Sequence, residues 1–527
     1  MCKTRKKRCN KSLPSCGYCI RKELHCVYTR VPRLSNHAVL TAERTRAEPI
    51  WGAWPPTSIA SSRMILSSNV PSDQTTAKAV HNQVYLEIHG MIRATGQFVD
   101  GISHRYFQGF HRHLPVISRI RFYNNLSTSG GAPGADVSVL LLTMCLITHA
   151  PALGFESEYG TFQMAEQHSL YLTARSLLTQ VQVSCSSSLP LIQAGILLAL
   201  YEYTHGRPDD AFMTITGSAR MAYAARIHTR DRHQTRMTHT TSHNADSDID
   251  LLLQAEEAAN TWWGIVICER TFLIEATVFD QPMVTVFPGV DARLPIEPEV
   301  LDQLDISGSK YLPNVPISCL TSEKIEGFGR TVQATYLLDQ VLKSFDTPDI
   351  DSRLLQLDRL DTNIQAFLSL VMAQCQGHSG IFCVSINIAI RTLFMVHWHI
   401  FGQHPQAVRA NFRSQEEWFE RSQDALDTVT KIVVNTAESL IGESLANTAT
   451  PMVDLMPPTY TYISCAALRH IRRSTHREGV DWLESAKNML QTSLDKYFQR
   501  WSVSDDWVKV RSHTEHVACS AGCVLGI

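Results

Sequence analysis

Several signatures of common protein classes are missing from this sequence of 527 residues. It contains no nucleophile elbow, no zinc-protease helix motif and no dinucleotide-binding fingerprint, so nothing in it indicates catalysis. A secretory signal pattern is also missing, which disfavours a disulfide-stabilised secreted protein. The best candidate for a membrane span, residues 381–401, is interrupted by Asn387, Arg391, His397 and His399. We therefore predict that it is a buried helix.

Net charge is small, at −2, but its distribution is uneven. Residues 1–30 contain nine lysines and arginines and a single acid, Glu23, whereas acids outnumber bases in the remainder. A basic head on a mildly acidic body favours a protein that contacts nucleic acid at one end only.

Cysteine is sparse over most of the chain and concentrated at its start. Of 14 cysteines, five follow the spacing Cys2-x6-Cys9-x6-Cys16-x2-Cys19-x6-Cys26. Regular spacing of this kind is typical of metal ligands, and thiolates bind zinc. The other cysteines are dispersed, mostly in apolar runs, and we interpret them as reduced, buried side chains.

Basic side chains alternate with these cysteines, at Lys3, Arg5, Lys6, Lys7, Arg8, Lys11, Arg21 and Lys22. Lysine and arginine bind phosphate, so one short segment combines a metal site with a polyanion-binding surface. The run from Lys3 to Arg8 could also be a solvated basic stretch or a nuclear-import signal. Its position between cysteines at ligand spacing favours contact with DNA.

These residues resemble the fungal binuclear zinc-cluster transcription factors, whose six cysteines run Cys-x2-Cys-x6-Cys, a loop, then Cys-x2-Cys-x6-Cys. The five cysteines match the second to sixth positions, and Pro14 falls where the family places a loop proline. The resemblance implies two zinc ions. It also implies that a short helix presents Arg5 and Lys6 to a CGG-type triplet, while the other basic residues contact phosphates.

The family's first cysteine would fall two residues before Met1. In the family the first and fourth cysteines each bridge both ions, so of the two bridges only Cys16 is present. His25 is a weak substitute because it neighbours Cys26. Two explanations stay open: the natural product begins upstream of Met1, which we favour, or the cluster is degenerate.

Beyond the head, residues 31–80 are rich in Pro, Ser, Thr and Ala and lack both apolar periodicity and a heptad run, which predicts a flexible linker. From residue 81 to 527 apolar residues recur at helical spacing, as in Phe212, Ile215, Ala219 and Ala222. Further stripes cover residues 252–273 and 483–501. The pair Trp262-Trp263 lies on such a stripe and is predicted to be core.

Three segments of this helical body resemble the middle homology region of the same transcription factors. They are Tyr106-Phe107 through His111 to the run Leu114–Ser118, then Tyr201-Glu202-Tyr203 to Gly206, and Glu256-Glu257 through Trp262-Trp263 to Gln281-Pro282. Each segment alone is a weak signal. Their order downstream of a cysteine cluster is more specific.

The prediction is a mostly α protein, with a zinc-cluster module at residues 1–30, a linker at 31–80 and an all-α regulatory domain at 81–527. Its predicted function is nuclear, sequence-specific regulation of genes transcribed by RNA polymerase II. The expected partners are double-stranded DNA, a second copy of the chain, and a small-molecule effector or co-regulator, with no membrane. The alternatives are an interaction protein whose truncated cluster no longer binds DNA and, less favoured, an all-α enzyme.

Overall fold

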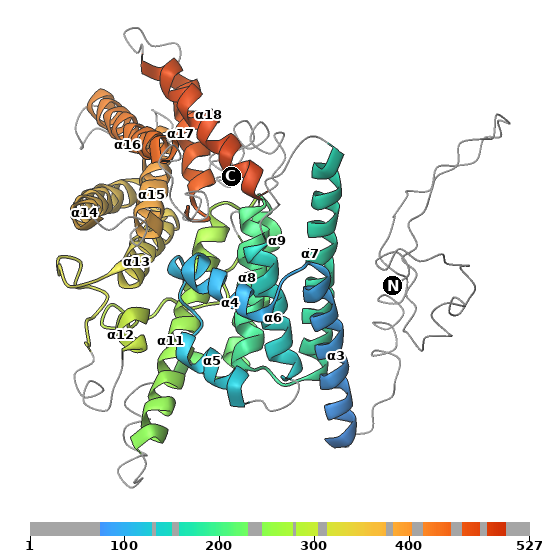
Figure 1. Cartoon of the computed structure of the whole chain (residues 1–527). Helices are drawn as coiled ribbons and strands as arrows, with labels where there is room; N and C mark the ends of the chain where they lie inside the picture. The colour runs from blue at the N-terminus through green and yellow to red at the C-terminus, as the bar shows by residue number, and fades with distance from the viewer. Residues whose placement is uncertain are drawn as a thin grey trace, which may run out of the picture. The chain divides into compact units, whose positions relative to one another are not determined.

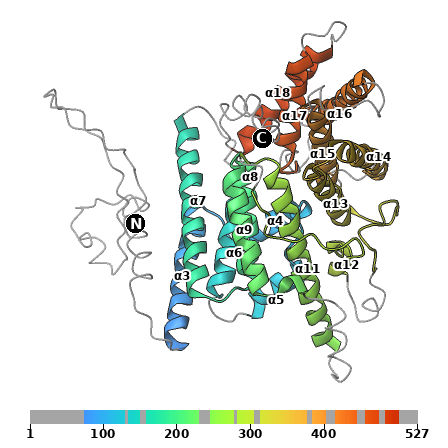
Figure 2. The same ribbon diagram turned by 180° about the vertical axis from the view of Figure 1, so that it is seen from behind.

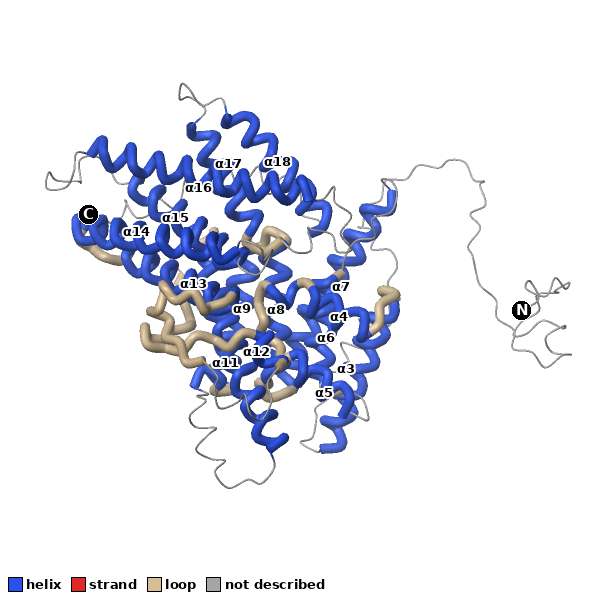
Figure 3. Tube along the Cα trace, turned by 60° about the vertical axis from the view of Figure 1, so that its left-hand side comes forward, coloured by secondary structure: helices blue, strands red, loops and turns tan. Residues whose placement is uncertain are grey.

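The computed structural model describes residues 74–128, 133–149, 158–229, 245–277, 281–303, 313–375, 383–402, 415–443, 456–474 and 482–501. Most of these residues are helical, residues 281–297 and 313–326 form loops, and none of the segments contains a strand (Figure 3). Their one β-type pairing is an isolated antiparallel bridge between Arg293 and Pro316. The mostly α fold class predicted from the sequence is confirmed.

The N-terminal half is a bundle of α3 (Gln74–Ala94), α4 (Val99–Gln108), α5 (Arg119–Thr128), α6 (Ala135–Thr148), α7 (Glu158–Ser184), α8 (Leu189–Thr204), α9 (Pro208–Ala224) and α11 (Ala245–Leu273), with the short 3-10 helices η1 (Phe110–Arg112) and η2 (Ile227–Thr229). Helix α6 contacts α3, α4, α7 and α8, and α9 lies between α8 and α11. Figure 1 shows these long helices side by side, and Figure 2 shows the same arrangement from behind.

Helices α6 and α8 form the centre of this bundle because they have no polar face. Nearly every residue of both helices is buried. A helix that is apolar all round must be covered by neighbours on every side, and the surrounding helices provide that cover. The amphipathic helices around them then turn their polar faces outward.

The turn between α8 and α9 has a specific sequence requirement. Gly206 has a φ of +71°, which glycine adopts without steric cost. Its N–H donates to the carbonyl of Tyr203 at 3.1 Å, and the N–H of Arg207 donates to the carbonyl of Glu202 at 3.0 Å. This pair of bonds is a Schellman motif, and Pro208 begins the next helix directly after it.

The C-terminal half consists of α12 (Pro298–Asp302), α13 (Gly327–Phe345), α14 (Ile350–Cys375), α15 (Cys383–Gly402), α16 (Gln415–Glu443), α17 (Tyr460–Ser474) and α18 (Trp482–Trp501). Helix α15 is its centre and contacts α13, α14, α16 and α17. The two halves meet where α11 packs on α13, and one continuous apolar core extends from Val84 to Trp501.

Helix α15 is long and apolar enough to cross a membrane by length and composition, but 83% of its most apolar window is buried inside the protein. Its polar side chains have partners within the fold. Asn387 donates to Thr459 Oγ1 at 3.1 Å, and Arg391 pairs with Glu275 at 2.6 Å. The prediction of a buried helix at residues 381–401 is confirmed.

The apolar stripes also lie where the sequence predicted them. Phe212, Ile215, Ala219 and Ala222 are all buried on α9, and the stripe of residues 483–501 forms the inner face of α18. One difference is at the start of the body, because α3 begins at Gln74. Residues 74–80, which composition assigned to the linker, belong to this helix. They show no apolar periodicity, so the sequence pattern did not predict the first two turns.

Candidate functional site

The side chains predicted to bind zinc and DNA lie outside the described residues. They are the cysteines Cys2, Cys9, Cys16, Cys19 and Cys26 and the basic residues Lys3, Arg5, Lys6, Lys7, Arg8, Lys11, Arg21 and Lys22. Their roles therefore stay predictions. The described geometry belongs to the helical body.

Two of the segments that resemble the middle homology region meet at the loop formed by residues 114–118. The carbonyl of Val116 accepts hydrogen bonds from Gln193 Nε2 of α8 at 2.7 Å and from Thr261 Oγ1 of α11 at 3.1 Å. A Cβ on Gly264 would lie only 2.4 Å from Val116 Cγ1. The loop is therefore held by two helices, and position 264 has room for glycine only unless Val116 moves.

Glu257 is the buried acid at this junction. Its Oε1 accepts the backbone N–H of Ser118 at 3.0 Å and Gln193 Nε2 at 3.1 Å, and its Oε2 pairs with Arg121. Burial raises the pKa of Glu257, whereas the Arg121 guanidinium and these hydrogen bonds lower it. Arg121 also pairs with Asp250 at 3.2 Å, so one guanidinium serves two carboxylates.

A cavity of about 340 Å³ adjoins this junction. Its walls come from α5, α6, the start of α8, the end of α9 with η2, and α11. Arg121, Gln193 and Glu257 are among its polar lining residues, together with Asn125, Ser187, Ser188 and Gln254. The sequence did not reveal Arg121 or Gln193 as residues of a common site, because their partners lie up to 136 residues away along the chain.

A second polar cluster lies near the C-terminal end of α11. Arg270 donates from Nε to Asp339 at 2.9 Å, and from Nη1 and Nη2 to the Oγ1 and carbonyl of Thr285 at 2.6 and 3.1 Å. Glu269 accepts the backbone N–H groups of Val284 and Thr285 at 2.6 and 3.0 Å. The cluster joins α11 to α13 and anchors the chain that follows the third resembling segment.

The remaining resembling segment, at the end of α8, also makes structural contacts. Glu202 accepts the Tyr171 hydroxyl at 2.8 Å and pairs with Arg175 at 2.6 Å. Tyr203 stacks on Tyr462 with ring centroids 4.1 Å apart, and the Tyr462 hydroxyl donates to the Tyr203 carbonyl. These residues therefore connect α8 to α7 on one side and to α17 on the other.

The tryptophan pair of α11 is part of the core, as predicted. Trp262 and Trp263 are both buried, and Trp262 packs edge-on against Tyr223 at a centroid distance of 5.2 Å. His228 contacts the same rings. The histidines farther along that stretch, His233, His239 and His243, lie outside the described residues.

Ser422, His397 and Asp361 form an arrangement that looks like a hydrolytic triad. His397 Nδ1 lies 3.3 Å from Ser422 Oγ, and its Nε2 lies 3.3 Å from Asp361 Oδ1. All three side chains are sealed in the core between α14, α15 and α16, with at most 3% of each residue exposed. A substrate has no access to the serine, so the arrangement is a structural polar contact.

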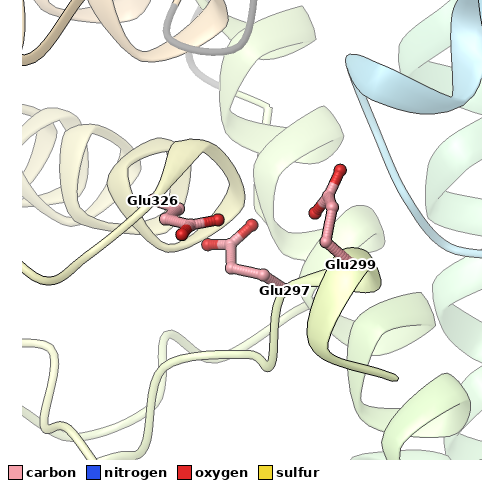
Figure 4. Close-up of side chains that lie close together, drawn as sticks. All are labelled: Glu297, Glu299 and Glu326. Atoms are coloured by element: carbon pink, nitrogen blue, oxygen red, sulfur yellow. The ribbon is translucent and has the colours of Figure 1, made fainter. Parts of the chain in front are cut away.

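Three glutamates approach one another beside α12, namely Glu297, Glu299 and Glu326 (Figure 4). Glu297 accepts the backbone N–H groups of Phe328 at 3.1 Å and Gly329 at 2.8 Å, so it caps the N-terminus of α13. Burial, aided by the two neighbouring acids, raises the pKa of Glu297 to about 7. The capping bonds account for the position of Glu297, whereas Glu299 and Glu326 are exposed.

Comparison with known proteins adds the family. A family model described as the fungal-specific transcription factor domain matches residues 104–374, just over half of the chain. The chain belongs to the fungal-specific transcription factor family. A model of the fungal Zn(2)-Cys(6) binuclear cluster domain matches residues 1–35. The resemblance inferred from the motifs is confirmed.

A curated relative is transcription factor BOA15 of Botryotinia fuckeliana (strain B05.10). It is 31% identical over 136 residues, which are 26% of this chain and 71% of that protein. No solved structure matches the chain. The chain is thus a fungal transcription regulator rather than an enzyme, and its cluster domain implies binding of zinc and DNA and action in the nucleus.

Proposed function

We propose that residues 1–30 form a binuclear zinc cluster that recognises CGG-type triplets in double-stranded DNA, and that the helical body regulates this activity. The observation that supports the proposal is the cysteine spacing from Cys2 to Cys26 with a basic run between its first two cysteines. The matched cluster domain covers the same residues.

The five thiolates suit zinc because structural zinc sites prefer tetrahedral sulfur ligands. Bound zinc would hold the two cysteine-bearing segments together, at a contribution to folding of about 10 kcal/mol. A module of this length has almost no core to replace that contribution. The protein with residues 1–527 supplies five of the six cysteines of a complete cluster, so we expect it to hold fewer than two zinc ions stably.

Different basic side chains have different proposed tasks. Arg5 and Lys6 would donate hydrogen bonds to guanine O6 and N7 in the major groove. Lys3, Lys7, Arg8, Lys11, Arg21 and Lys22 would contact phosphates and fix the register of the module on the duplex. Base contacts create preference for a sequence, whereas phosphate contacts strengthen binding to every sequence.

DNA titrations test this division on a protein extended upstream so that a cysteine stands two residues before Met1. Arg5→Ala or Lys6→Ala should cost about 1–3 kcal/mol on a CGG duplex and reduce its advantage over scrambled DNA. The matched control, Lys22→Ala, should weaken both duplexes alike and make the salt dependence shallower by about one unit. An unchanged specificity ratio in Arg5→Ala and Lys6→Ala would refute base readout by this run.

The competing function is a regulator that acts through protein contacts with an incomplete cluster. Zinc analysis of the protein extended upstream by the sixth cysteine separates the two. A chelator-resistant pair of ions and CGG-selective DNA binding in that protein support the DNA-binding regulator, whereas weak zinc and no selectivity in it support the alternative. A homodimer and a co-regulator stay predictions.

A further inference from the structure

The cavity beside the 114–118 loop has the form of a small-molecule site. It lies between helices of the N-terminal half, and its volume of about 340 Å³ is at the lower end of the range for ligand pockets. Most of its walls are apolar, formed by Ile117, Phe122, Val137, Leu140, Leu189 and Ile227. Polar side chains from α5, α8, α11 and the residues just before α8 complete the lining.

Gln193 provides a hydrogen-bond acceptor in the lining of the cavity. Its Nε2 donates to the carbonyl of Val116, to Glu257 Oε1 and towards Thr261 Oγ1. The Val116 carbonyl and the Glu257 carboxylate can only accept, so the amide orientation is fixed with Nε2 towards them. Its Oε1 accepts no hydrogen bond from any residue in the described part of the chain, although the residue is only 1% exposed.

Gln193 Oε1 is not sealed from solvent, because it opens on the cavity, so water can satisfy it there when no ligand is bound. A ligand that offers an N–H or O–H group would replace that water, whereas a ligand without a donor would displace the water and leave the oxygen unpaired. Because Gln193 lines the cavity, a bound molecule can reach its Oε1. The acceptor therefore selects molecules that carry at least one hydrogen-bond donor.

The charges around the cavity favour a neutral molecule. Arg121 is already paired with Glu257 and Asp250, so these three groups together carry one negative charge when ionised. An anion would meet that excess of negative charge. A cation would have to compete with Arg121 for Glu257. The Glu257 carboxylate already accepts hydrogen bonds from the Ser118 N–H and from Gln193 Nε2.

We propose that this cavity binds a small, neutral, largely apolar molecule that donates one hydrogen bond to Gln193 Oε1. Such a molecule would contact α5, α6, α8 and α11 together. It would therefore stabilise the arrangement in which the 114–118 loop is held against α8 and α11. The site goes beyond the proposed DNA recognition, because every residue in it belongs to the helical body.

The test uses the full chain and indole as the probe, since indole is neutral and apolar and carries a single N–H donor. Thermal unfolding is followed by circular dichroism at increasing indole concentration. We expect a saturable rise in Tm, because a ligand that binds only the folded state stabilises it. Benzofuran has the same shape with an oxygen in place of the N–H, and it should bind at least about threefold more weakly because it has no donor for Oε1. Benzoate should produce no rise.

Cavity-filling variants locate the site. Val137 and Ala225 line the cavity and are half-buried, so Val137→Phe and, as a second variant, Ala225→Leu should fill it without removing a polar contact. Val183→Phe on the exposed side of α7 is the matched control. We expect indole affinity to fall at least tenfold in the filled variants and to stay unchanged in Val183→Phe. Equal binding of indole and benzofuran, indole binding unaffected by filling, or no saturable binding to the wild-type chain would each overturn the proposal. None of these readouts depends on DNA.

Discussion

The two polar clusters of α11 use the same chemistry in different surroundings. Near the middle of the helix Glu257 pairs with Arg121, whose side chain stays 13% exposed and lines a cavity. Near the C-terminal end Arg270 pairs with Asp339, and both side chains are fully enclosed. An enclosed pair leaves a charge stranded when one partner is lost, whereas an open pair retains access to water. We therefore expect the sealed cluster to matter for stability and the open one to be available for binding.

Loss of the sealed arginine should have the largest effect. Arg270→Ala leaves Glu269 without a guanidinium partner and leaves Asp339 with only the exposed Lys343, and we expect unfolding to become easier by about 3–5 kcal/mol. Urea unfolding of the full chain, followed by circular dichroism, measures the change. The double variant Arg270→Leu with Asp339→Leu is the control, because removal of both charges should recover part of the loss. A loss below about 1 kcal/mol for the single variant would contradict the expectation that the enclosed cluster contributes more to stability than the cluster beside the cavity.

Loss of the open arginine should cost less. In Arg121→Met, Glu257 keeps the Ser118 N–H and Gln193 as donors, so we expect a loss of about 1–3 kcal/mol. Without Arg121 the folded-state pKa of Glu257 rises further above its unfolded value. A carboxyl with a raised folded pKa loses stability as pH rises, so the variant should be closer to wild type at pH 5.5 than at pH 8. A loss that does not change with pH would contradict this account.

Substitution of Glu297, the acid that caps α13, should have a smaller effect on stability, and that effect should depend on pH over a defined range. The folded-state pKa of Glu297 is raised to about 7, so its ionisation reduces stability as pH increases from the ordinary value of 4.5 to 7. Phe328 donates to Oε2 and Gly329 to Oε1, so Glu297→Gln, like the protonated acid, keeps one carbonyl oxygen as acceptor and carries no charge. We expect it to be more stable than wild type by about 1 kcal/mol at pH 8 and equal to it near pH 4.5. Melting curves at both values provide the measurement, and a variant that is less stable at pH 8 would show that the anion is the better cap.

Zinc removal should leave the body unchanged. The apolar core begins at Val84, and no core side chain precedes it among the described residues. A chelator should therefore abolish DNA binding by the head while the helical melting transition keeps its midpoint. Circular dichroism at increasing temperature, with and without chelator, measures this. A lowered midpoint would show that the head contributes to the stability of the body.

The sequence predicted the amphipathic helices well because the helical spacing of their apolar residues can be recognised within a single segment. The stripe of Phe212, Ile215, Ala219 and Ala222 needs no knowledge of its neighbours. Helix α6 is different, since its residues are apolar on every side and no periodicity says which neighbours cover it. No pattern in the sequence indicated a role for Gln193. It stands in an apolar run, and its role depends on Val116 and Glu257, which come from two other elements.

The contact between Tyr203 and Tyr462 joins residues 259 positions apart along the chain. During synthesis, α8 therefore leaves the ribosome long before the helix that covers its Tyr203 ring exists. The helices around α6 and α8 make many short-range contacts and can associate early, but their exposed aromatic surface stays open until α17 has been made. Trp501 closes the same region last, against Phe110 and His205. A protein interrupted before Tyr460 would carry this open surface permanently, which makes chaperone binding and aggregation its expected fates.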